Sequence, residues 1–197
     1  PGTEQQDKRQ KHIARIRASV NHLSDILEEF LSVGRLEEGR VEARPSRFRP
    51  DELVRDVVGD MQGMLKTGQT IDTTLACAVE VYLDKSLLRK ILVNLLSNAT
   101  KYSGEHRSVR VEGTCGGGQL RISVRDEGIG ISPDDQERLF ERFFRAKNAT
   151  NIQGTGLGLH IVGRYVELLG GRVELQSELN QGTTVTLFLP YENHPAD

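Results

Sequence analysis

The 197-residue sequence has no apolar run that approaches the roughly 20 residues of a transmembrane helix. Residues 1–10 are polar and charged, so they do not have the pattern of a signal peptide. We therefore expect a chain that is soluble as it stands and cytoplasmic. A membrane-anchored parent protein stays open, with any membrane attachment made by parts outside this sequence.

A strong net charge is also missing. The formal net charge is −2, so bulk attraction to nucleic acid or to an anionic membrane is not expected, although a local basic patch stays compatible with it. Apolar residues make up 37% and charged residues 27%, which is the balance of an ordinary soluble globular protein. The length suits one domain, or one domain with an appendage.

The sequence has only two cysteines, Cys77 and Cys115, which lie far apart and in no metal-binding spacing. A cysteine-ligated metal site is therefore not predicted. We expect both residues to be small, buried and reduced, as in a protein of a reducing compartment.

Residues 8–38 are predicted to form one long helix. Its apolar residues recur at alternating spacings of three and four, the a/d seam of a heptad repeat: Ile13, Ile16, Val20, Leu23, Leu27 and Phe30. Ile26 and Leu31 widen this stripe as in a helical bundle, and Gly39 is a plausible end of the helix. Such a stripe needs a partner helix, from the same chain or from another.

The remainder mixes helices and strands without a regular alternation. Pro45 and Pro50 mark a short extended link, and Asp84 is expected to cap a helix. Expected helices span residues 50–65, 85–103 and 158–169, with a helix start at 132–135; expected strands span 70–76, 79–83, 108–114, 120–126, 172–178 and 183–190. This order predicts an α+β fold, a two-layer sandwich with helices covering one face of a sheet.

Polar residues interrupt the apolar helix at 85–103. Asn94 and Asn98 share one helix face, and Lys101 follows three residues later on that side. Buried amides need partners, and amide oxygens suit a hard cation such as Mg²⁺ shared with phosphates. A solvated helix face explains these residues equally well when they are taken alone.

Two glycine-rich segments follow. The first, Asp126-Glu-Gly128-Ile-Gly130, lies at the end of a strand. Its glycines allow close approach of a flat ligand, and Asp126 can accept a hydrogen bond from an exocyclic amine. An ordinary turn with an exposed aspartate is the competing interpretation. The second opens the helix at residue 158, so its N–H groups can cradle phosphate; it consists of Gly154, Thr155, Gly156, Leu157, Gly158 and Leu159.

Several nucleotide-binding and kinase motifs are missing. The second glycine segment is not the dinucleotide fingerprint G-x-G-x-x-G, and no G-x-x-x-x-G-K-[ST] segment exists. The H-R-D and D-F-G motifs of protein kinases are missing as well. A P-loop or protein-kinase nucleotide site is therefore unsupported.

The three segments in this order resemble the ATP-binding domain of sensor histidine kinases, within the gyrase–Hsp90–histidine kinase–MutL superfamily, which has the Bergerat ATP-binding fold. The likeness covers about residues 46–190. Residues 94–102 look like the N box, 126–130 the G1 box and 154–159 the G2 box. Leu139-Phe-Glu-Arg-Phe-Phe-Arg145 resembles the F box, and Gly182-Thr-Thr184 the last, weaker box.

The resemblance implies a binding site for ATP and Mg²⁺. Asp126 would bind the adenine amine, with Thr184 a weaker candidate nearby, and Tyr102 would lie against the base or ribose. Asn98, together with Asn94, would hold Mg²⁺ against the triphosphate. Further contacts would come from the glycines of both boxes and from the backbone of residues 154–159.

Phosphate contacts would come from Lys101 and Arg145. Residues 147–153 would form the ATP lid, and this stretch is expected to be mobile because Ile152 is its only packing anchor. Asn94, Lys101 and Arg145 would then act in catalysis by positioning and by neutralising the transferring γ-phosphoryl group.

The resemblance also implies a domain organisation. Residues 1–44 look like the second helix of the dimerisation and phosphotransfer region, 45–191 like the catalytic domain and 192–197 like a tail. The expected partners are a response-regulator receiver domain and a second copy of the parent through the dimerisation helices. The five histidines, His12, His22, His106, His160 and His194, lack the context of a phosphoacceptor, so this chain is not expected to label itself.

Two other functions remain. The domain can be a degenerate ATP-binding module that acts by interaction, although every expected residue type of the ATP site is present. It can also be another superfamily ATPase or a serine kinase of the anti-sigma type. A superfamily ATPase usually has a glutamate as general base where Asn94 stands, and an amide cannot take that proton.

Overall fold

The computed structural model describes residues 2–192 and, in the first helix, only part of the side chains. It divides the chain into two compact units, residues 1–40 and 41–197. The expected tail, 192–197, lies outside the described residues except for Glu192, whose carbonyl accepts a hydrogen bond from the Tyr82 backbone N–H at 2.9 Å.

The first unit is the long helix α1, Gly2–Glu37, followed by Gly39 in the left-handed conformation with a φ of +64°. The helix predicted at 8–38 is therefore confirmed, and it begins earlier than expected. The six seam residues, from Ile13 to Phe30, are each between 51% and 64% exposed.

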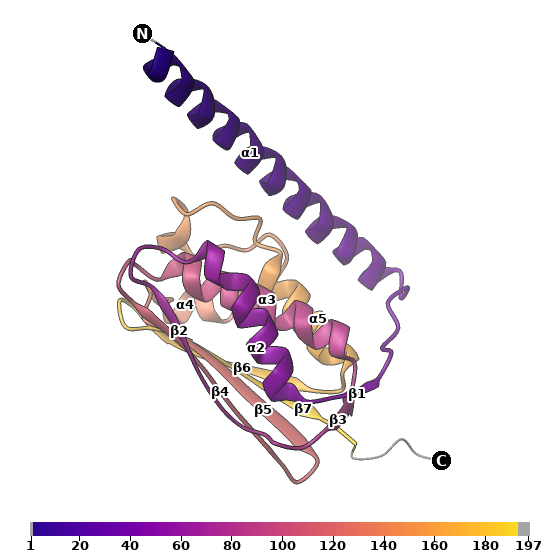
Figure 1. The fold of residues 1–197 in the computed structure, drawn as a ribbon. Coiled ribbons are helices and arrows are strands. Elements are labelled where there is room, and N and C mark those ends of the chain that lie inside the picture. Colours follow the sequence, from indigo (N-terminus) through magenta and orange to yellow (C-terminus); the bar gives the residue numbers. More distant parts are fainter. Residues whose placement is uncertain (1, 193–197) are drawn as a thin grey trace. The chain divides into compact units, whose positions relative to one another are not determined.

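The second unit is built on a five-stranded sheet with the order β2-β4-β5-β7-β6 (Figure 1). Strands β2 and β4 are parallel, and the other neighbours are antiparallel. The strands are β2 Thr70–Ala76, β4 Ser108–Gly116, β5 Gln119–Asp126, β6 Arg172–Glu178 and β7 Gly182–Pro190. A two-stranded sheet joins β1, Ser46–Phe48, to β3, Val81–Leu83; the first of these was expected only as an extended link.

Three helices lie on one side of this sheet (Figure 1). They are α2 Pro50–Met61, α3 Lys85–Tyr102 and α5 Gly158–Leu168. The expected cap of α3 is present, since the Asp84 carboxylate accepts a hydrogen bond from Leu87 N at 2.9 Å. Shorter elements are η1 Gln62–Met64, α4 Pro133–Gln136 and η2 Lys147–Ala149.

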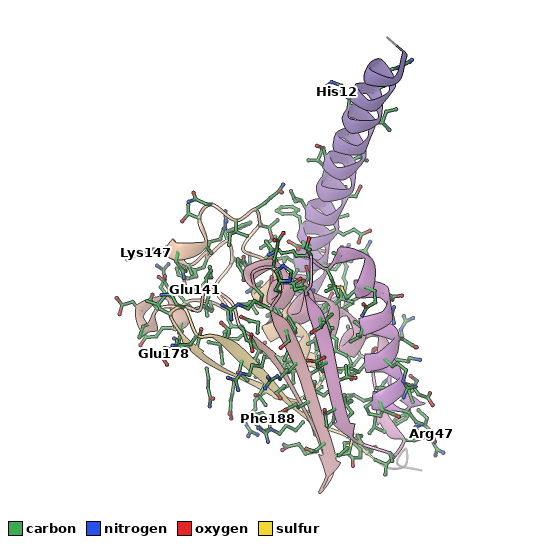
Figure 2. All side chains as sticks on the ribbon, turned by 60° about the vertical axis from the view of Figure 1, so that its left-hand side comes forward. His12, Arg47, Glu141, Lys147, Glu178 and Phe188 are labelled. Atoms are coloured by element: carbon green, nitrogen blue, oxygen red, sulfur yellow. A yellow bond between two sulfur atoms is a disulfide. The ribbon has the colours of Figure 1, made fainter. Side chains whose placement is uncertain are left out.

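The core lies between these helices and one face of the sheet. Alternate residues of the central strands, such as Ile122 and Leu187, are fully buried against helix residues such as Leu88 and Ile91. The other face carries charged and aromatic side chains such as Phe188, which is labelled in Figure 2. The guanidinium carbon of Arg172 lies 3.9 Å from the centroid of the Phe188 ring. The predicted two-layer α+β sandwich is confirmed.

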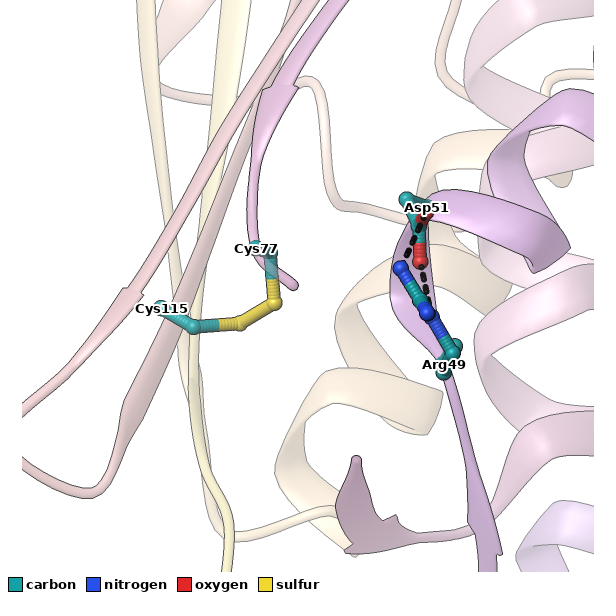
Figure 3. Close-up of a disulfide and its surroundings, with 4 residues drawn as sticks. All are labelled: Arg49, Asp51, Cys77 and Cys115. Carbon is teal, nitrogen blue, oxygen red and sulfur yellow. Dashed lines mark hydrogen bonds and ion pairs between the residues drawn. A yellow bond between two sulfur atoms is a disulfide. The ribbon is translucent and has the colours of Figure 1, made fainter. Parts of the chain in front are cut away.

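The expectation that the two cysteines are reduced is wrong for this structure. Cys77 and Cys115 form a disulfide with their Cα atoms 4.9 Å apart (Figure 3). The reason is the parallel register, which pairs Ala76 with Thr114 and so places the next residue of each strand side by side. The sequence did not predict this contact, because the two cysteines are 38 residues apart and the connection between their strands contains α3.

Removal of the disulfide should destabilise the domain. A crosslink that closes a loop of 38 residues stabilises by about 3–4 kcal/mol in the chain-entropy model. We expect the double variant Cys77→Ala/Cys115→Ala to lose a free energy of unfolding of this order, measured by urea denaturation without reductant. With reductant, the wild type should approach the variant; equal stabilities without reductant, or two titratable thiols in the oxidised protein, would contradict the assignment.

Candidate functional site

The two amides of α3 face the start of α5. Asn94 Nδ2 donates to the Lys90 carbonyl at 3.0 Å, which leaves the amide oxygen directed away from its own helix. A Cβ on Gly158 would lie 3.0 Å from Asn94 Oδ1 and 3.7 Å from Asn98 Nδ2. The N-terminus of α5 therefore lies beside both asparagines, at a position where glycine leaves room.

The next turn of α3 lies beside the other end of the glycine segment. A Cβ on Gly154 would lie 2.7 Å from Lys101 Nζ and 3.8 Å from the Tyr102 hydroxyl. Lys101 Nζ is also 5.1 Å from the centroid of the Tyr102 ring. Burial raises the pKa of the Tyr102 hydroxyl, while the positive charge of Arg145 lowers it. The structure thus brings the cations and the tyrosine together at the start of this segment.

Asp126 is the last residue of β5 and is only 9% exposed. Its Oδ1 accepts a hydrogen bond from Gly128 N at 2.8 Å. Burial raises the pKa of this carboxyl to about 6, and hydrogen bonds from the backbone N–H groups of Gly128 and Thr183 act in the opposite direction. A buried carboxylate with a raised pKa at the end of a strand is typical of a ligand-binding position.

The position expected for Thr184 is occupied by its neighbour. In the antiparallel register Thr183 lies opposite Asp126, whereas Thr184 lies opposite Arg125. Because side chains alternate between the two faces of a strand, Thr183 shares the face of Asp126 and Thr184 points to the other face. The assignment of Thr184 to a place near Asp126 is therefore wrong by one residue; the strand register, which the sequence did not fix, decides between them.

The glycines after Asp126 are required by backbone contacts. Gly128 forms a β-bridge with Ser103, and a Cβ there would lie 2.6 Å from the Tyr102 carbonyl oxygen. Gly130 has a φ of +62°, and a Cβ on it would overlap the Glu178 carbonyl. Gly128 therefore allows the loop after β5 to lie directly against the end of α3, and Gly130 allows the same loop to lie against the end of β6.

Arg145 contacts the lid in this structure. Its Nη2 donates to the carbonyl oxygens of Ala149 at 2.7 Å, Thr150 at 3.3 Å and Ile152. Among the described side chains, its Nε is buried without a hydrogen-bond partner. The guanidinium thus gathers three carbonyls of the segment predicted to be the lid, a role that the sequence did not indicate.

The lid segment is anchored more firmly than expected. Lys147 N donates to the Asp135 carboxylate at 3.0 Å, and Asn148 Nδ2 donates to the Gly130 carbonyl at 2.8 Å (Figure 2 labels Lys147). Ala149 is 6% exposed. The expectation that Ile152 is the only packing anchor is therefore wrong, because Ala149 is buried as well, and hydrogen bonds to Asp135 and Gly130 add to the anchoring.

The glycine segment before α5 has its own internal order. Gly156 has a φ of +76°, and a Cβ there would lie 2.7 Å from the Phe143 carbonyl carbon. Thr155 Oγ1 accepts a hydrogen bond from Leu157 N at 3.1 Å. Leu157 is 2% exposed and anchors the segment in the core, whereas Leu159 is half-buried.

Other kinds of site are not found in the described part of the chain. The side chains that the structure describes include no group of three or more His, Cys, Asp or Glu that could hold a metal ion. None of the described helices has the length and apolarity needed to cross a membrane.

Comparison with protein families gives one match over most of the second unit. The model described as "Histidine kinase-, DNA gyrase B-, and HSP90-like ATPase" matches residues 83–193.

Known histidine kinases are similar over nearly the whole chain. The circadian input-output histidine kinase CikA of Synechococcus elongatus is 32% identical over 190 residues, which cover 93% of this chain and 25% of that protein. The histidine protein kinase DivJ of Caulobacter vibrioides is 33% identical over 196 residues, covering 93% of this chain and 31% of that protein. The chain thus spans less than a third of the length of these relatives.

Solved structures of histidine kinases share the fold. The crystal structure of full-length ShkA in complex with AMPPNP has a TM-score of 0.82 and 29% identity, covering 95% of this chain and 40% of that one. The mycobacterial sensor histidine kinase MprB has a TM-score of 0.66 and 26% identity, covering 75% of this chain and 98% of that one.

The raised pKa of Asp126 gives a pH-dependent stability. Its pKa is about 6 in the folded protein against 3.8 ordinarily, so the folded state binds this proton more tightly and stability falls as pH rises from about 4 to about 6. Between pH 4 and pH 7, we expect the free energy of unfolding of the wild type to fall by at most about 3 kcal/mol relative to that of Asp126→Asn. Urea denaturation across this range measures it. Asp56→Asn, an exposed position on α2, is the control, and parallel curves for wild type and Asp126→Asn would contradict the raised pKa.

Proposed function

This chain belongs to the family of histidine kinase-, DNA gyrase B- and HSP90-like ATPases, and its second unit is the ATP-binding catalytic domain of a sensor histidine kinase. On that premise we propose the reaction that it catalyses. The domain binds ATP with Mg²⁺ and transfers the γ-phosphoryl group to a histidine on a dimerisation helix, for relay to an aspartate of a response-regulator receiver domain. We place it in the cytoplasm, where its substrate ATP is found, although the Cys77–Cys115 disulfide is unusual for that compartment.

The observation that carries this proposal is the convergence of three segments that are distant in the sequence. Asn94 and Asn98 of α3 face Gly158, Lys101 and Tyr102 lie beside Gly154, and the end of α3 bonds to the loop after Asp126. Two amides, a cation and a helix N-terminus therefore lie along one glycine segment, and these are groups that a nucleoside triphosphate with its metal ion requires.

The buried carboxylate suits the adenine end of the nucleotide. Asp126 is held by Gly128 N and by Thr183, so its orientation is fixed before a ligand arrives. A carboxylate that accepts from an exocyclic amine forms a charge-assisted hydrogen bond. Thr183 lies beside Asp126 and is the threonine that we assign to this end of the site.

The amide pair fits a Mg²⁺ ion. Asn94 uses its Nδ2 on the Lys90 carbonyl, so its oxygen is the atom turned toward Gly158, and oxygen is the ligand that this cation prefers. Asn98 lies one turn later on the same face and would be the second ligand through its amide oxygen, although its Nδ2 is the atom 3.7 Å from a Cβ on Gly158 in this structure. When bound, Mg²⁺ supplies positive charge that neutralises the phosphate oxygens.

Phosphate binding and transfer then depend on positioning. The N–H groups of the segment from Gly154 to Gly158 and the positive end of α5 receive the phosphates, and Lys101 adds a charge at Gly154. Arg145, which holds the lid carbonyls here, would add a second positive charge at the phosphates if it exchanged these carbonyls for phosphate oxygens. The acceptor histidine supplies the nucleophile, so this domain needs no general base of its own.

The alternative superfamily activities have less support. Hydrolysis requires a base for the attacking water, and Asn94 is an amide that is already bonded to the Lys90 carbonyl. A degenerate module would lack some of the groups that a nucleotide needs, yet each expected residue type is present and most lie together. The kinase reaction therefore explains more of this site than either alternative.

The helix of the first unit supports the dimeric organisation. Its six seam residues are exposed along one stripe, and an exposed apolar stripe of this length is an association surface. We assign this helix to the dimerisation region of the parent protein, which would pair two copies of the chain.

Asp126 should determine nucleotide affinity. We expect Asp126→Asn to weaken Mg-ADP binding by roughly 1.5–3 kcal/mol, because the charge-assisted bond to the adenine amine is lost. Isothermal calorimetry at pH 8, where the wild-type carboxyl is ionised, measures the change. The Asp56→Asn protein should bind like the wild type, and unchanged affinity in Asp126→Asn would remove this residue from the site.

The isolated chain should bind nucleotide without labelling itself. None of its five histidines is followed by an acidic residue, and the described His12 is an exposed helix residue. After incubation with γ-labelled ATP we expect no stable label, while calorimetry on the same sample shows Mg-ADP binding. An acid-labile, alkali-stable label at His12 or His22 would show that the acceptor has been misassigned.

A further inference from the structure

A turn outside the nucleotide site binds the end of α3. Gln69, just before β2, is 6% exposed, and its Nε2 donates to the Thr100 carbonyl at 2.9 Å and to the Gly104 carbonyl at 3.2 Å. Lys66 Nζ donates to the Lys101 carbonyl at 2.7 Å and also to the Ser103 carbonyl. Two side chains of one turn thus bond four carbonyls at the end of the helix.

These bonds satisfy carbonyls that have no partner within the helix. The last four carbonyls of an α-helix lack intrahelical donors, and leaving them buried and unpaired is costly. With the C-cap Ser103 included, three of these four carbonyls, those of Thr100, Lys101 and Ser103, accept from the turn, and the fourth, that of Tyr102, accepts from Ile129 N at 3.3 Å. The end of α3 is therefore held from one side by the turn at Lys66–Gln69 and from the other by the loop after Asp126.

The turn is also held by hydrogen bonds of its own. Gln69 Oε1 accepts from Lys66 N at 3.1 Å, and Gln69 N donates to the Lys66 carbonyl at 3.0 Å. The amide of Gln69 thus uses its oxygen within the turn and its nitrogen on the helix. An apolar side chain of similar size would lose both functions, and a carboxylate could not donate to the carbonyls.

The bonded carbonyls lie among the residues that face the nucleotide. Thr100 and Lys101 carry two of them, and Lys101 and Tyr102 are the side chains beside Gly154. Because the position of a side chain in a helix follows from its backbone, a small shift of this last turn moves both groups. Geometry of this kind affects ligand binding steeply, since binding groups must be held within fractions of an ångström.

We infer that Gln69, together with Lys66, is a positioning residue of the nucleotide site. It sets the end of α3 and thereby the places of Lys101 and Tyr102 without touching the nucleotide. Both residues lie before the segment 83–193 that the family model matches. This inference rests on the proposed ATP site.

Calorimetric titration of the full chain with Mg-ADP tests the inference. We expect Gln69→Leu to raise the dissociation constant about tenfold, which corresponds to about 1.4 kcal/mol. Lys66→Met, at an exposed position where the apolar stem is retained, should raise it about threefold to tenfold. Lys66→Arg keeps the N–H donors and should bind within about twofold of the wild type.

Gln62→Leu is the matched control. Gln62 is an exposed glutamine of the same region whose side chain bonds only to Val58 O in α2, so this variant should bind like the wild type. Urea denaturation of each protein shows whether it is folded at the titration temperature. Hydrogen exchange at the amides of Ser103 and Ile129 provides a second measurement, and both should exchange faster in Gln69→Leu and Lys66→Met.

The outcomes separate the inference from the proposed function. If the wild type does not bind Mg-ADP, the proposed function fails and the inference fails with it. If the wild type binds and both Gln69→Leu and Lys66→Met bind equally well, only the inference is overturned. It is also overturned if the weaker binding of a variant is fully explained by its unfolded fraction, or if Lys66→Arg binds as poorly as Lys66→Met. If Gln69→Leu does not fold, the comparison of Lys66→Arg with Lys66→Met decides.

Discussion

The last turn of α3 ends in carbonyl groups that must find donors outside the helix, and the surrounding structure is arranged around this requirement. On one side the donors come from the turn at Lys66–Gln69; on the other, Ile129 N bonds to the Tyr102 carbonyl. The second contact brings the loop after β5 so close that residue 128 must be a glycine. Asp126 then receives the N–H of Gly128, so the orientation of the buried carboxylate follows from how the helix ends.

A similar constraint acts where the lid meets α5. Gly156 adopts a positive φ against the backbone of Phe143, and Arg145 gathers the carbonyls of the lid. Asp135 and Asn148 join this segment to α4 and to the loop that contains Gly130. Movement of the lid therefore requires that these hydrogen bonds break. Most of them are formed by the side chains of Arg145 and Asn148, whose N–H groups could donate to a phosphate instead.

The sequence predicted the parts that depend on local pattern. The strand at 70–76, the cap at Asp84 and the glycine stop at residue 39 follow from periodicity, capping chemistry and backbone freedom, and the structure has all three. The convergence of the asparagines with the glycine segment could be expected only through the family resemblance.

What the sequence did not predict depends on register and on long-range contact. The register of β5 and β7 places Thr183 beside Asp126, and no feature of the sequence distinguishes Thr183 from Thr184. The disulfide depends on parallel pairing of strands 38 residues apart, which proximity in the sequence does not indicate. Gln69 appears as one polar residue in a loop, because its role exists only after the helix end is packed against it.

The parallel pairing of β2 with β4 has a consequence for how the domain folds. Parallel strands need a crossover connection, and here the crossover contains α3, which carries the asparagines, Lys101 and Tyr102. Contacts between residues this far apart require closure of a long loop, and they form slowly compared with the helix itself. Helix α3 can therefore form early, but its end becomes fixed only when β2 pairs with β4 at the edge of the sheet. A bound nucleotide then stabilises the fully assembled state alone, so occupancy of the site becomes a measure of completed folding.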